Sequence, residues 1–459
     1  MTKIAVSDRR WARLPVELSV RELDAKLLLA GVLADSGWGV LIGQEAQVRS
    51  ARLPGPSVHY DKSIAPGMTK ALTTALGDGS IFTANCEEGL VYLDAPTYVR
   101  RKISADNLAA CSTFFCWGEH QADDLVATFG LDHARLILSG NPRVDLLRPE
   151  MRSFYEPSAK SIRERHGQFI LFNTKFGRFN PFIGREKFYE MAKGSWGLIR
   201  TEEEDAKFRN SVRHQEETFE HTIRLIDTVA ASRPDIAVIV RPHPSENWST
   251  YLHRFGSSRG ISVATAGSAV EWIAAASAMV HSDCTTGVEA FVLDRPSICY
   301  EPLNEADYDI ELPRMLSLRC GTDDAVLGAI DAALAGRTLL DPAAAVAMAQ
   351  TAQHHMANIF GQPAVNVIAE RFEPFDLARV SLHREVAQQC FVNAVEVGDA
   401  LVVDHHIDPS QQNYRAQKFP LRHADEIAST LGRLGRATGQ FTALHVAELT
   451  ENLFCVYRP

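Results

Sequence analysis

The chain has no closely spaced cysteines, no long apolar run and no excess of positive charge. Its eight cysteines are scattered, without a CxxC pair or a zinc-type Cys/His grouping, so neither a zinc site nor a disulfide framework is expected. No segment approaches the roughly 18 consecutive apolar residues that span a bilayer, and the first residues lack the apolar core of a signal peptide. We therefore expect a cytoplasmic protein without a transmembrane segment, whose cysteines are free thiols.

The charge balance argues against nucleic acid as a partner. The 459 residues carry a formal net charge of −10, whereas binding to a phosphate backbone requires a cationic face. The hydrophobic share of 46% and the charged share of 23% are ordinary for a globular protein. The length predicts two or three domains.

Short apolar strands alternate with helical stretches along most of the chain. Residues 21–34 have the spacing of a core-facing helix, and a turn at Gly37 leads into a strand at 40–43. Further strands are expected at 58–60, 81–85, 113–117, 134–139, 169–174, 236–240, 261–264, 278–281 and 297–300, with helices that include 202–231 and 269–278. This pattern predicts an α/β fold with parallel sheets covered by helices on both faces.

Two composition changes suggest the domain boundaries. Turn residues at 140–145 close the first α/β run, and a charged stretch follows. We expect a Rossmann-like domain at 1–150, a second at 151–375, and an extension at 376–459 without a legible function. Within the extension, a helix at 379–392, a strand at 396–403 and a helix at 424–434 are expected.

Two turns at predicted strand ends have the residues of a phosphate site. The strand at 236–240 stops in Arg241-Pro242-His243-Pro244, which fixes an arginine and a histidine at its carboxyl end. The strand at 278–281 is followed by Ser282, Thr285, Thr286 and Gly287 before a helix. Open α/β sheets bind ligands at the carboxyl ends of their strands, and backbone amides at a helix start attract anions.

These features together resemble a known family. Two doubly wound domains facing a cleft describe the glycosyltransferase B architecture, and residues 10–370 resemble the bacterial surface carbohydrate biosynthesis proteins. The motifs concerned are 21–26, 86–90, 140–145, 241–244 and 282–290. Glu87-Glu88-Gly89 together with His243-Pro244 also resembles the acidic-Gly and His-Pro motifs of bacterial sialyltransferases and related CMP-sugar enzymes.

The resemblance implies three catalytic residues. Glu87 or Glu88 would act as the base that takes a proton from the acceptor hydroxyl; we favour Glu87 as the base and Glu88 as the residue that orients it, although the sequence does not separate the two. His243 would donate a hydrogen bond or a proton to the leaving phosphate, whose charge grows as the glycosidic bond breaks. The alternatives are a solvated acidic turn and an exposed turn histidine.

The resemblance also implies a set of donor-binding residues. It comprises Arg241, Pro244, Ser282, Thr285, Thr286, Gly287 and Glu289, with Asn173, Thr174 and Lys175 at the end of the first strand of the second domain. Helix capping is the alternative role for the two threonines, and a surface ion pair is the alternative for Arg241. The nucleotide sugar is a substrate, and neither a metal nor a cofactor is expected.

We therefore expect a glycosyltransferase that moves an ulosonic acid of the sialic acid or Kdo type from a CMP donor to a surface glycan. Peripheral association with a membrane assembly complex is compatible with this function. Three alternatives stay open: a CDP-polyol phosphotransferase of the teichoic-acid type, a UDP-sugar 2-epimerase, and a non-catalytic scaffold that binds a nucleotide sugar. The acidic-Gly pair favours glycosyl transfer, since phosphotransfer would place its base differently.

Overall fold

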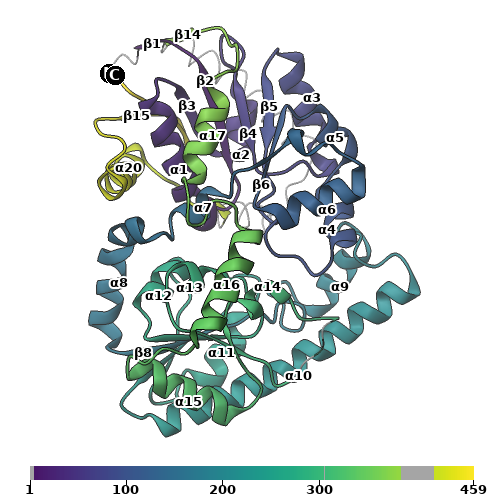
Figure 1. The fold of residues 1–459 in the computed structure, drawn as a ribbon, viewed down its shortest axis with the longest axis vertical. Coiled ribbons are helices and arrows are strands. Elements are labelled where there is room, and N and C mark those ends of the chain that lie inside the picture. Colours follow the sequence, from purple (N-terminus) through teal and green to yellow (C-terminus); the bar gives the residue numbers. More distant parts are fainter. Residues whose placement is uncertain (1–4, 304, 306, 384–417) are drawn as a thin grey trace. The chain divides into compact units, whose positions relative to one another are not determined.

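Two units, each built around its own sheet, make up the computed structural model, which describes residues 5–303, 305, 307–383 and 418–459 (Figure 1). Unit 1 consists of the described residues within Met1–Leu90, Asp94–Phe154 and Gln353–Pro459. Unit 2 consists of those within Val91–Leu93 and Tyr155–Ala352. Each unit has a largely parallel sheet and surrounding helices, which confirms the predicted α/β class with two Rossmann-like parts.

The sheet of unit 1 has the strand order β15-β16-β3-β2-β4-β5-β6-β7. The strands from β3 to β7 are parallel, whereas β16 runs antiparallel to β3 and β15 antiparallel to β16. Their bounds are β2 Trp11–Val16, β3 Gly39–Gln44, β4 Val58–Asp61, β5 Ile81–Ala84, β6 Thr113–Cys116, β7 Leu136–Leu138, β15 His445–Thr450 and β16 Leu453–Tyr457. A separate pair is formed by β1 Ala5–Arg9 and β14 Val380–His383.

Strand β2 lies inside this sheet although the sequence analysis did not predict it. All of its residues are buried. Its sequence contains Arg13 and Pro15, which break the apolar run by which a buried strand is recognised. The buried guanidinium of Arg13 donates to Ser57 Oγ at 2.9 Å and to the carbonyl of Val48 at 2.9 Å, so tertiary contacts satisfy its polar groups.

The helices of unit 1 surround this sheet in Figure 1. They are α1 Ser19–Asp35, α2 Glu45–Ser50, α3 Thr69–Gly77, α4 Ala95–Lys102, α5 Ala105–Ala110, α6 Glu119–Phe129, α7 Pro142–Asp145, α17 Ala364–Phe372 and α20 Ala424–Thr438, with 3₁₀ turns Pro66–Met68, His133–Arg135 and Pro149–Met151. Helices α8 Arg152–His166 and α16 Pro342–His355 each have residues assigned to both units.

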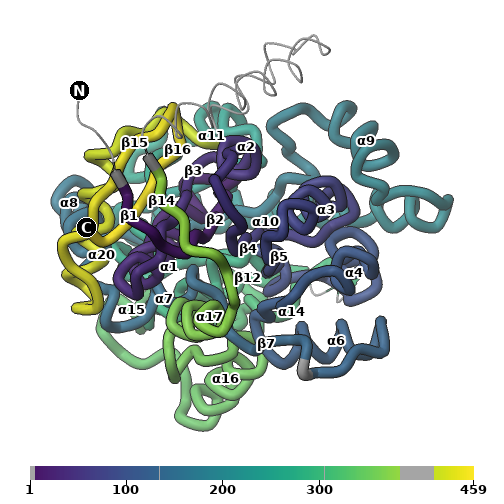
Figure 2. Tube along the Cα trace, turned by 90° about the horizontal axis from the view of Figure 1, so that it is seen from above, coloured from purple at the N-terminus to yellow at the C-terminus, as the bar shows by residue number. Residues whose placement is uncertain are grey.

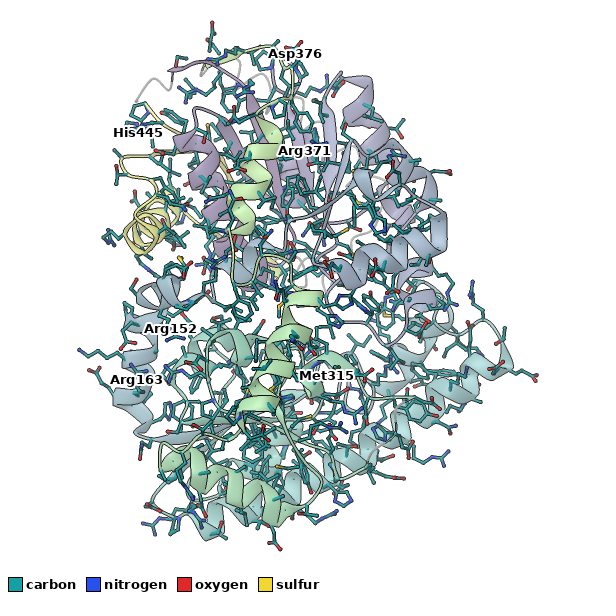
Figure 3. All side chains as sticks on the ribbon, viewed as in Figure 1. Arg152, Arg163, Met315, Arg371, Asp376 and His445 are labelled. Atoms are coloured by element: carbon teal, nitrogen blue, oxygen red, sulfur yellow. The ribbon has the colours of Figure 1, made fainter. Side chains whose placement is uncertain are left out.

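The described residues of the predicted extension, 376–383 and 418–459, belong to unit 1. Strand β16 pairs with β3 along Val40–Gly43, and α20 packs against α1 (Figure 2). Residues 353–375, which the prediction placed in the second domain, also belong to unit 1. Asp145 accepts the first amides of α17, from Ala364 and Val365, at 2.9 Å each, and α17 carries Arg371 in Figure 3. These residues belong to unit 1 because they pair with and pack against elements of the first 150 residues.

The remaining predictions for the carboxyl-terminal region have mixed outcomes. The helix expected at 379–392 is wrong where it can be compared, because Val380–His383 is strand β14. The rest of that segment and the strand expected at 396–403 lie outside the described residues. The helix expected at 424–434 is confirmed as α20.

The sheet of unit 2 is parallel, with the strand order β10-β9-β8-β11-β12-β13. The bounds are β8 Phe169–Asn173, β9 Ala237–Arg241, β10 Ile261–Val263, β11 Ala278–His281, β12 Ser297–Tyr300 and β13 Leu318–Cys320. This is the 3-2-1-4-5-6 order of the doubly wound fold. From β8 the chain adds β9 and β10 on one side of the sheet, and from β11 it adds β12 and β13 on the other side. The neighbouring strands β8 and β11 are therefore the topological switch point.

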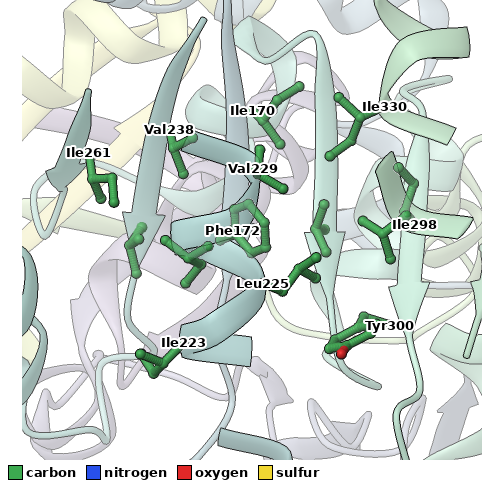
Figure 4. Packing of buried hydrophobic residues seen from close by; sticks show 14 of the residues in the cluster. Ile170, Phe172, Ile223, Leu225, Val229, Val238, Ile261, Ile298, Tyr300 and Ile330 are labelled. Atoms are coloured by element: carbon green, nitrogen blue, oxygen red, sulfur yellow. The ribbon is translucent and has the colours of Figure 1, made fainter. Parts of the chain in front are cut away.

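Helices and a continuous apolar core cover this sheet. The helices are α9 Arg185–Lys193, α10 Glu202–Ser232, α11 Trp248–Phe255, α12 Ala269–Ala275, α13 Thr286–Val292, α14 Glu311–Met315 and α15 Asp323–Leu334. Ile170, Phe172, Val238 and Ile298 from the strands pack against Val229 of α10 (Figure 4). The nearly continuous apolar strands are those of a sheet buried on both faces, which is why the sequence predicted them.

Candidate functional site

The predicted donor-binding residues gather at one edge of unit 2. Residues 173–175 begin at the last residue of β8, 241–246 begin at the last residue of β9, and 282–289 follow β11. In the sheet register Asn173 lies opposite both Arg241 and His281, so the three segments leave neighbouring strands at the same level. This edge is the carboxyl end of the β8/β11 switch point, where doubly wound sheets bind ligands.

His243 is exposed in the turn after β9, and its ring is oriented by Ser245. The ring Nδ1 accepts the backbone N–H of Ser245 at 3.2 Å and lies 2.7 Å from the Ser245 hydroxyl. Because an amide can only donate, the neutral ring carries its proton on Nε2. The histidine therefore presents a hydrogen-bond donor on the side away from Ser245.

Glu246 anchors this turn and was missed by sequence reasoning. Its fully buried carboxylate accepts the backbone N–H of His243 at 3.0 Å and the Thr174 hydroxyl at 2.7 Å, and the Tyr251 hydroxyl also donates to it. Burial raises the pKa of Glu246, and these hydrogen bonds oppose that rise. Glu246 thus ties the turn after β9 to the end of β8.

Arg241 lies at this edge, but its guanidinium already has partners. It donates to the carbonyls of Ala266 and Gly267 in the loop after β10. Burial lowers the pKa of Arg241 to about 10, while the charges of Glu271 and Glu289 act in the opposite direction. These contacts give Arg241 a role in shaping the neighbouring loop, and a phosphate contact remains a prediction.

The turn after β11 is held in an unusual backbone conformation. Asp283 has φ 47°, which is rare for a residue with a side chain, and Lys175 Nζ donates to its carboxylate at 2.8 Å. A Cβ on Gly287 would come within 2.6 Å of the His281 ring, so the turn requires glycine there. Thr285 precedes α13 without a capping hydrogen bond, and no nitrogen or oxygen atom of a described residue is a hydrogen-bond partner of the buried Thr286 hydroxyl. Helix capping therefore does not account for these threonines.

Glu87 lies at the carboxyl edge of unit 1, in the segment after β5. Asn85 Nδ2 donates to Glu87 Oε1 at 3.3 Å, Arg143 Nη1 lies 3.7 Å from Oε2, and Arg21 donates to the Glu87 carbonyl at 3.2 Å. Burial raises the pKa of Glu87, but Lys26, Arg143 and Arg21 outweigh this, and the pKa is lowered. Glu87 is thus held ionised inside the protein.

Glu88 differs from Glu87 in exposure and in partner. Its side chain is 52% exposed, and it forms an ion pair with Lys102. Burial acts to raise the pKa of Glu88, but the charge and hydrogen bond of Lys102 lower it overall. Glu88 therefore forms a surface ion pair, whereas Glu87 Oε2 accepts no hydrogen bond within the described part of the chain.

Other unpartnered buried atoms occur at the same edge as Glu87. They are Tyr60 Oη near the end of β4, Asn85 Oδ1 after β5, and Asn141 Nδ2 after β7. Most buried polar atoms in proteins have a partner, so such a group calls for an explanation. The set includes both donors and acceptors, which is what hydroxyl groups of a ligand require.

Glu22 and Lys26 form a buried ion pair on α1 beside this group, and the sequence assigned them no role. Lys26 Nζ lies 3.7 Å from Glu22 Oε2 and donates to the carbonyl of Pro15. Glu22 Oε2 accepts the backbone N–H of Glu17 at 3.1 Å. Burial raises the pKa of Glu22 to about 7, with the charge of Glu87 adding to the rise and Lys26 opposing it.

This raised pKa predicts a specific pH dependence of stability. Between pH 4.5, the ordinary value, and pH 7, folded Glu22 binds more protons than unfolded Glu22, so its contribution to stability is lost as the pH rises. Relative to Glu22→Gln, the wild type should lose about 3 kcal/mol of unfolding free energy across this window. Urea unfolding at several pH values measures it, with the surface variant Glu426→Gln as control. Parallel curves for wild type and Glu22→Gln would contradict the prediction.

The described residues bear on three expectations from the sequence: the state of the cysteines, a metal site and a membrane-spanning segment. Among residues 5–303, 305, 307–383 and 418–459, the cysteines are buried free thiols, as predicted. Within those same residues, His, Cys, Asp and Glu form no group of three or more suited to a metal ion. No helix in this part of the chain combines the length and apolar character needed to cross a bilayer.

Comparison with known proteins gives distant structural similarities only. No family model and no curated protein matches the sequence. A variant of the wall teichoic acid polymerase TagF aligns with a TM-score of 0.48 and 10% identity over 83% of this chain and 89% of that one. The UDP-GlcNAc 2-epimerase from Methanocaldococcus jannaschii aligns at 0.45 and 13% over 80% and 99%. That from Neisseria meningitidis, bound to UDP-GlcNAc, aligns at 0.46 and 11% over 80% and 100%. These values assign neither a reaction nor a substrate.

Proposed function

We propose that this chain is a glycosyltransferase that moves an ulosonic acid from a CMP donor to a hydroxyl of a surface glycan. The observation that carries the proposal is the state of Glu87, a buried, ionised carboxylate whose Oε2 accepts no hydrogen bond from the residues that the structure describes. An acceptor hydroxyl can donate to this oxygen and then give up its proton to it. The neighbouring unpartnered atoms of Tyr60, Asn85 and Asn141 would bind further hydroxyls.

The donor phosphate would bind at the β8/β11 edge of unit 2. The Nε2–H of His243 supplies a donor for the phosphate oxygen that gains charge in the transition state. The Thr286 hydroxyl and the amides around Gly287 supply neutral donors at the same edge. Such donors stabilise charge without a metal ion, so transfer is expected to persist in EDTA.

The nucleotide is tested by a thermal-shift comparison of CMP, CDP, UDP and GDP. A ligand that binds only the native state raises the melting temperature by mass action. CMP should give the largest shift, and His243→Ala should lose much of it, whereas His253→Ala on α11 should not. A preference for CDP would favour a CDP-polyol phosphotransferase, and a preference for UDP would favour a UDP-sugar 2-epimerase. No shift with CMP would overturn the proposed donor.

A further inference from the structure

A small pocket in unit 2 lies beside the predicted phosphate site. Its walls come from the ends of β8, β11 and β12, from α10, and from the segment leading into α14. Lys175 and Asp283 form the wall nearest the switch point, and His214 of α10 faces the pocket from another wall. No role was assigned to His214 by the sequence.

The charged groups of this pocket already have ion-pair or hydrogen-bond partners. Lys175 Nζ lies 2.8 Å from Asp283 Oδ2, and His214 Nε2 lies 2.8 Å from Asp309 Oδ1. Arg314 Nε donates to Glu301 Oε1 at 2.7 Å. A phosphate or a metal ion would have to displace one of these partners, and an unpaired buried charge is costly. The pocket therefore suits an uncharged polar ligand.

His214 offers an unused acceptor in this pocket. The residue is only 8% exposed, yet its Nδ1 has no hydrogen-bond partner among the described residues, and Glu305 Oε2 lies 3.9 Å away. Since Nε2 donates to Asp309, Nδ1 of the neutral ring is an acceptor. The hydrogen bond to Asp309 raises the pKa of His214, so Nδ1 acts as an acceptor only above that pKa, where the ring is neutral. A hydroxyl of a ligand can supply the missing donor.

Aromatic surface accompanies these polar groups. Tyr300 and Tyr308 line the pocket, and the Tyr308 ring lies beside the His214 ring with centroids 5.6 Å apart. A few fixed polar groups beside aromatic surface are typical of sites that orient a small molecule.

We propose that this pocket receives one uncharged hydroxyl of the donor's sugar, which donates to His214 Nδ1. The inference rests on the proposed function, because the pocket adjoins the predicted phosphate site through Lys175 and Ser282. It adds a specificity-determining residue: His214 distinguishes a nucleotide sugar from the bare nucleotide, whereas His243 binds both.

Calorimetric titration of the full chain with CMP, CMP-N-acetylneuraminic acid and CMP-Kdo tests this subsite. In the wild type, one CMP-sugar should bind about tenfold more tightly than CMP, the effect of roughly one hydrogen bond. His214→Gln retains a donor for Asp309 but lacks the ring acceptor, so it should bind that CMP-sugar no better than CMP. Its affinity for CMP should be unchanged. His221→Gln, on the same helix but outside the pocket, should behave like the wild type.

Three results would overturn the subsite: a tenfold preference that survives in His214→Gln, an equal loss of CMP affinity in that variant, or no preference for either CMP-sugar in the wild type. Each of these leaves CMP binding in the wild type intact, so the proposed function would stand. Absence of CMP binding to the wild type would instead overturn the proposed function, and this inference with it.

Discussion

Glu87→Gln should lower kcat by roughly 10²- to 10⁴-fold, the usual size of general-base catalysis. The amide keeps the shape of the side chain but cannot take a proton from the acceptor. Affinity for CMP should barely change, because the nucleotide is proposed to bind in unit 2. Steady-state kinetics with a CMP-sugar and its acceptor, together with CMP titration, separate the two effects.

Glu88→Gln is the matched control for this experiment. Glu88 is the neighbouring residue, but it is largely exposed and already paired with Lys102, so its loss should affect kcat much less. Glu87→Asp retains the carboxylate and should recover part of the activity, which a merely structural role would not require. If Glu87→Gln turns over as fast as the wild type, the sialyltransferase-like mechanism must be abandoned.

Glu246→Ala should destabilise the protein by about 3–5 kcal/mol, the scale of breaking a buried polar network. The substitution removes the acceptor of the Thr174 and Tyr251 hydroxyls and of the His243 amide. With the turn after β9 released, CMP affinity should also fall. Urea unfolding and CMP titration measure the two consequences.

Glu216→Ala serves as the control for Glu246, because Glu216 is an exposed acid on α10 of the same unit. It should change neither stability nor CMP affinity appreciably. Glu246→Gln, which keeps an acceptor oxygen, should lie between wild type and Glu246→Ala. Full stability in Glu246→Ala would show that the turn is held by other contacts.

Much of the fold was predictable because most strands are short apolar runs between helices. Residues 169–174 and 278–281, for example, appear as β8 and β11 at nearly the predicted bounds. Strand β2 was not predictable in this way, since Arg13 and Pro15 interrupt its apolar run. The pairing of β16 with β3 joins residues about 400 positions apart, and no local pattern encodes such a contact.

The residues of the candidate site that lie in turns directly after a strand could be predicted from the sequence. The turns with His243 and Thr286 were identified because carboxyl strand ends are the usual ligand edge of such sheets. Glu22, Glu246 and His214 were missed because their properties come from tertiary neighbours. Glu246 becomes an anchor only through Thr174 and Tyr251, and Glu22 acquires its pKa of about 7 only when buried.

Strand β16 pairs with β3 but lies near the end of this sequence, so during synthesis the sheet of unit 1 is completed after the sheet of unit 2 can form. Unit 2 lies almost entirely within Tyr155–Ala352, so its sheet can form as soon as that stretch has left the exit tunnel. Strand β3 emerges much earlier, but its outer edge has to wait for Leu453–Tyr457. Throughout that interval the nascent chain carries an unpaired strand edge, which is a site for aggregation and for chaperone capture.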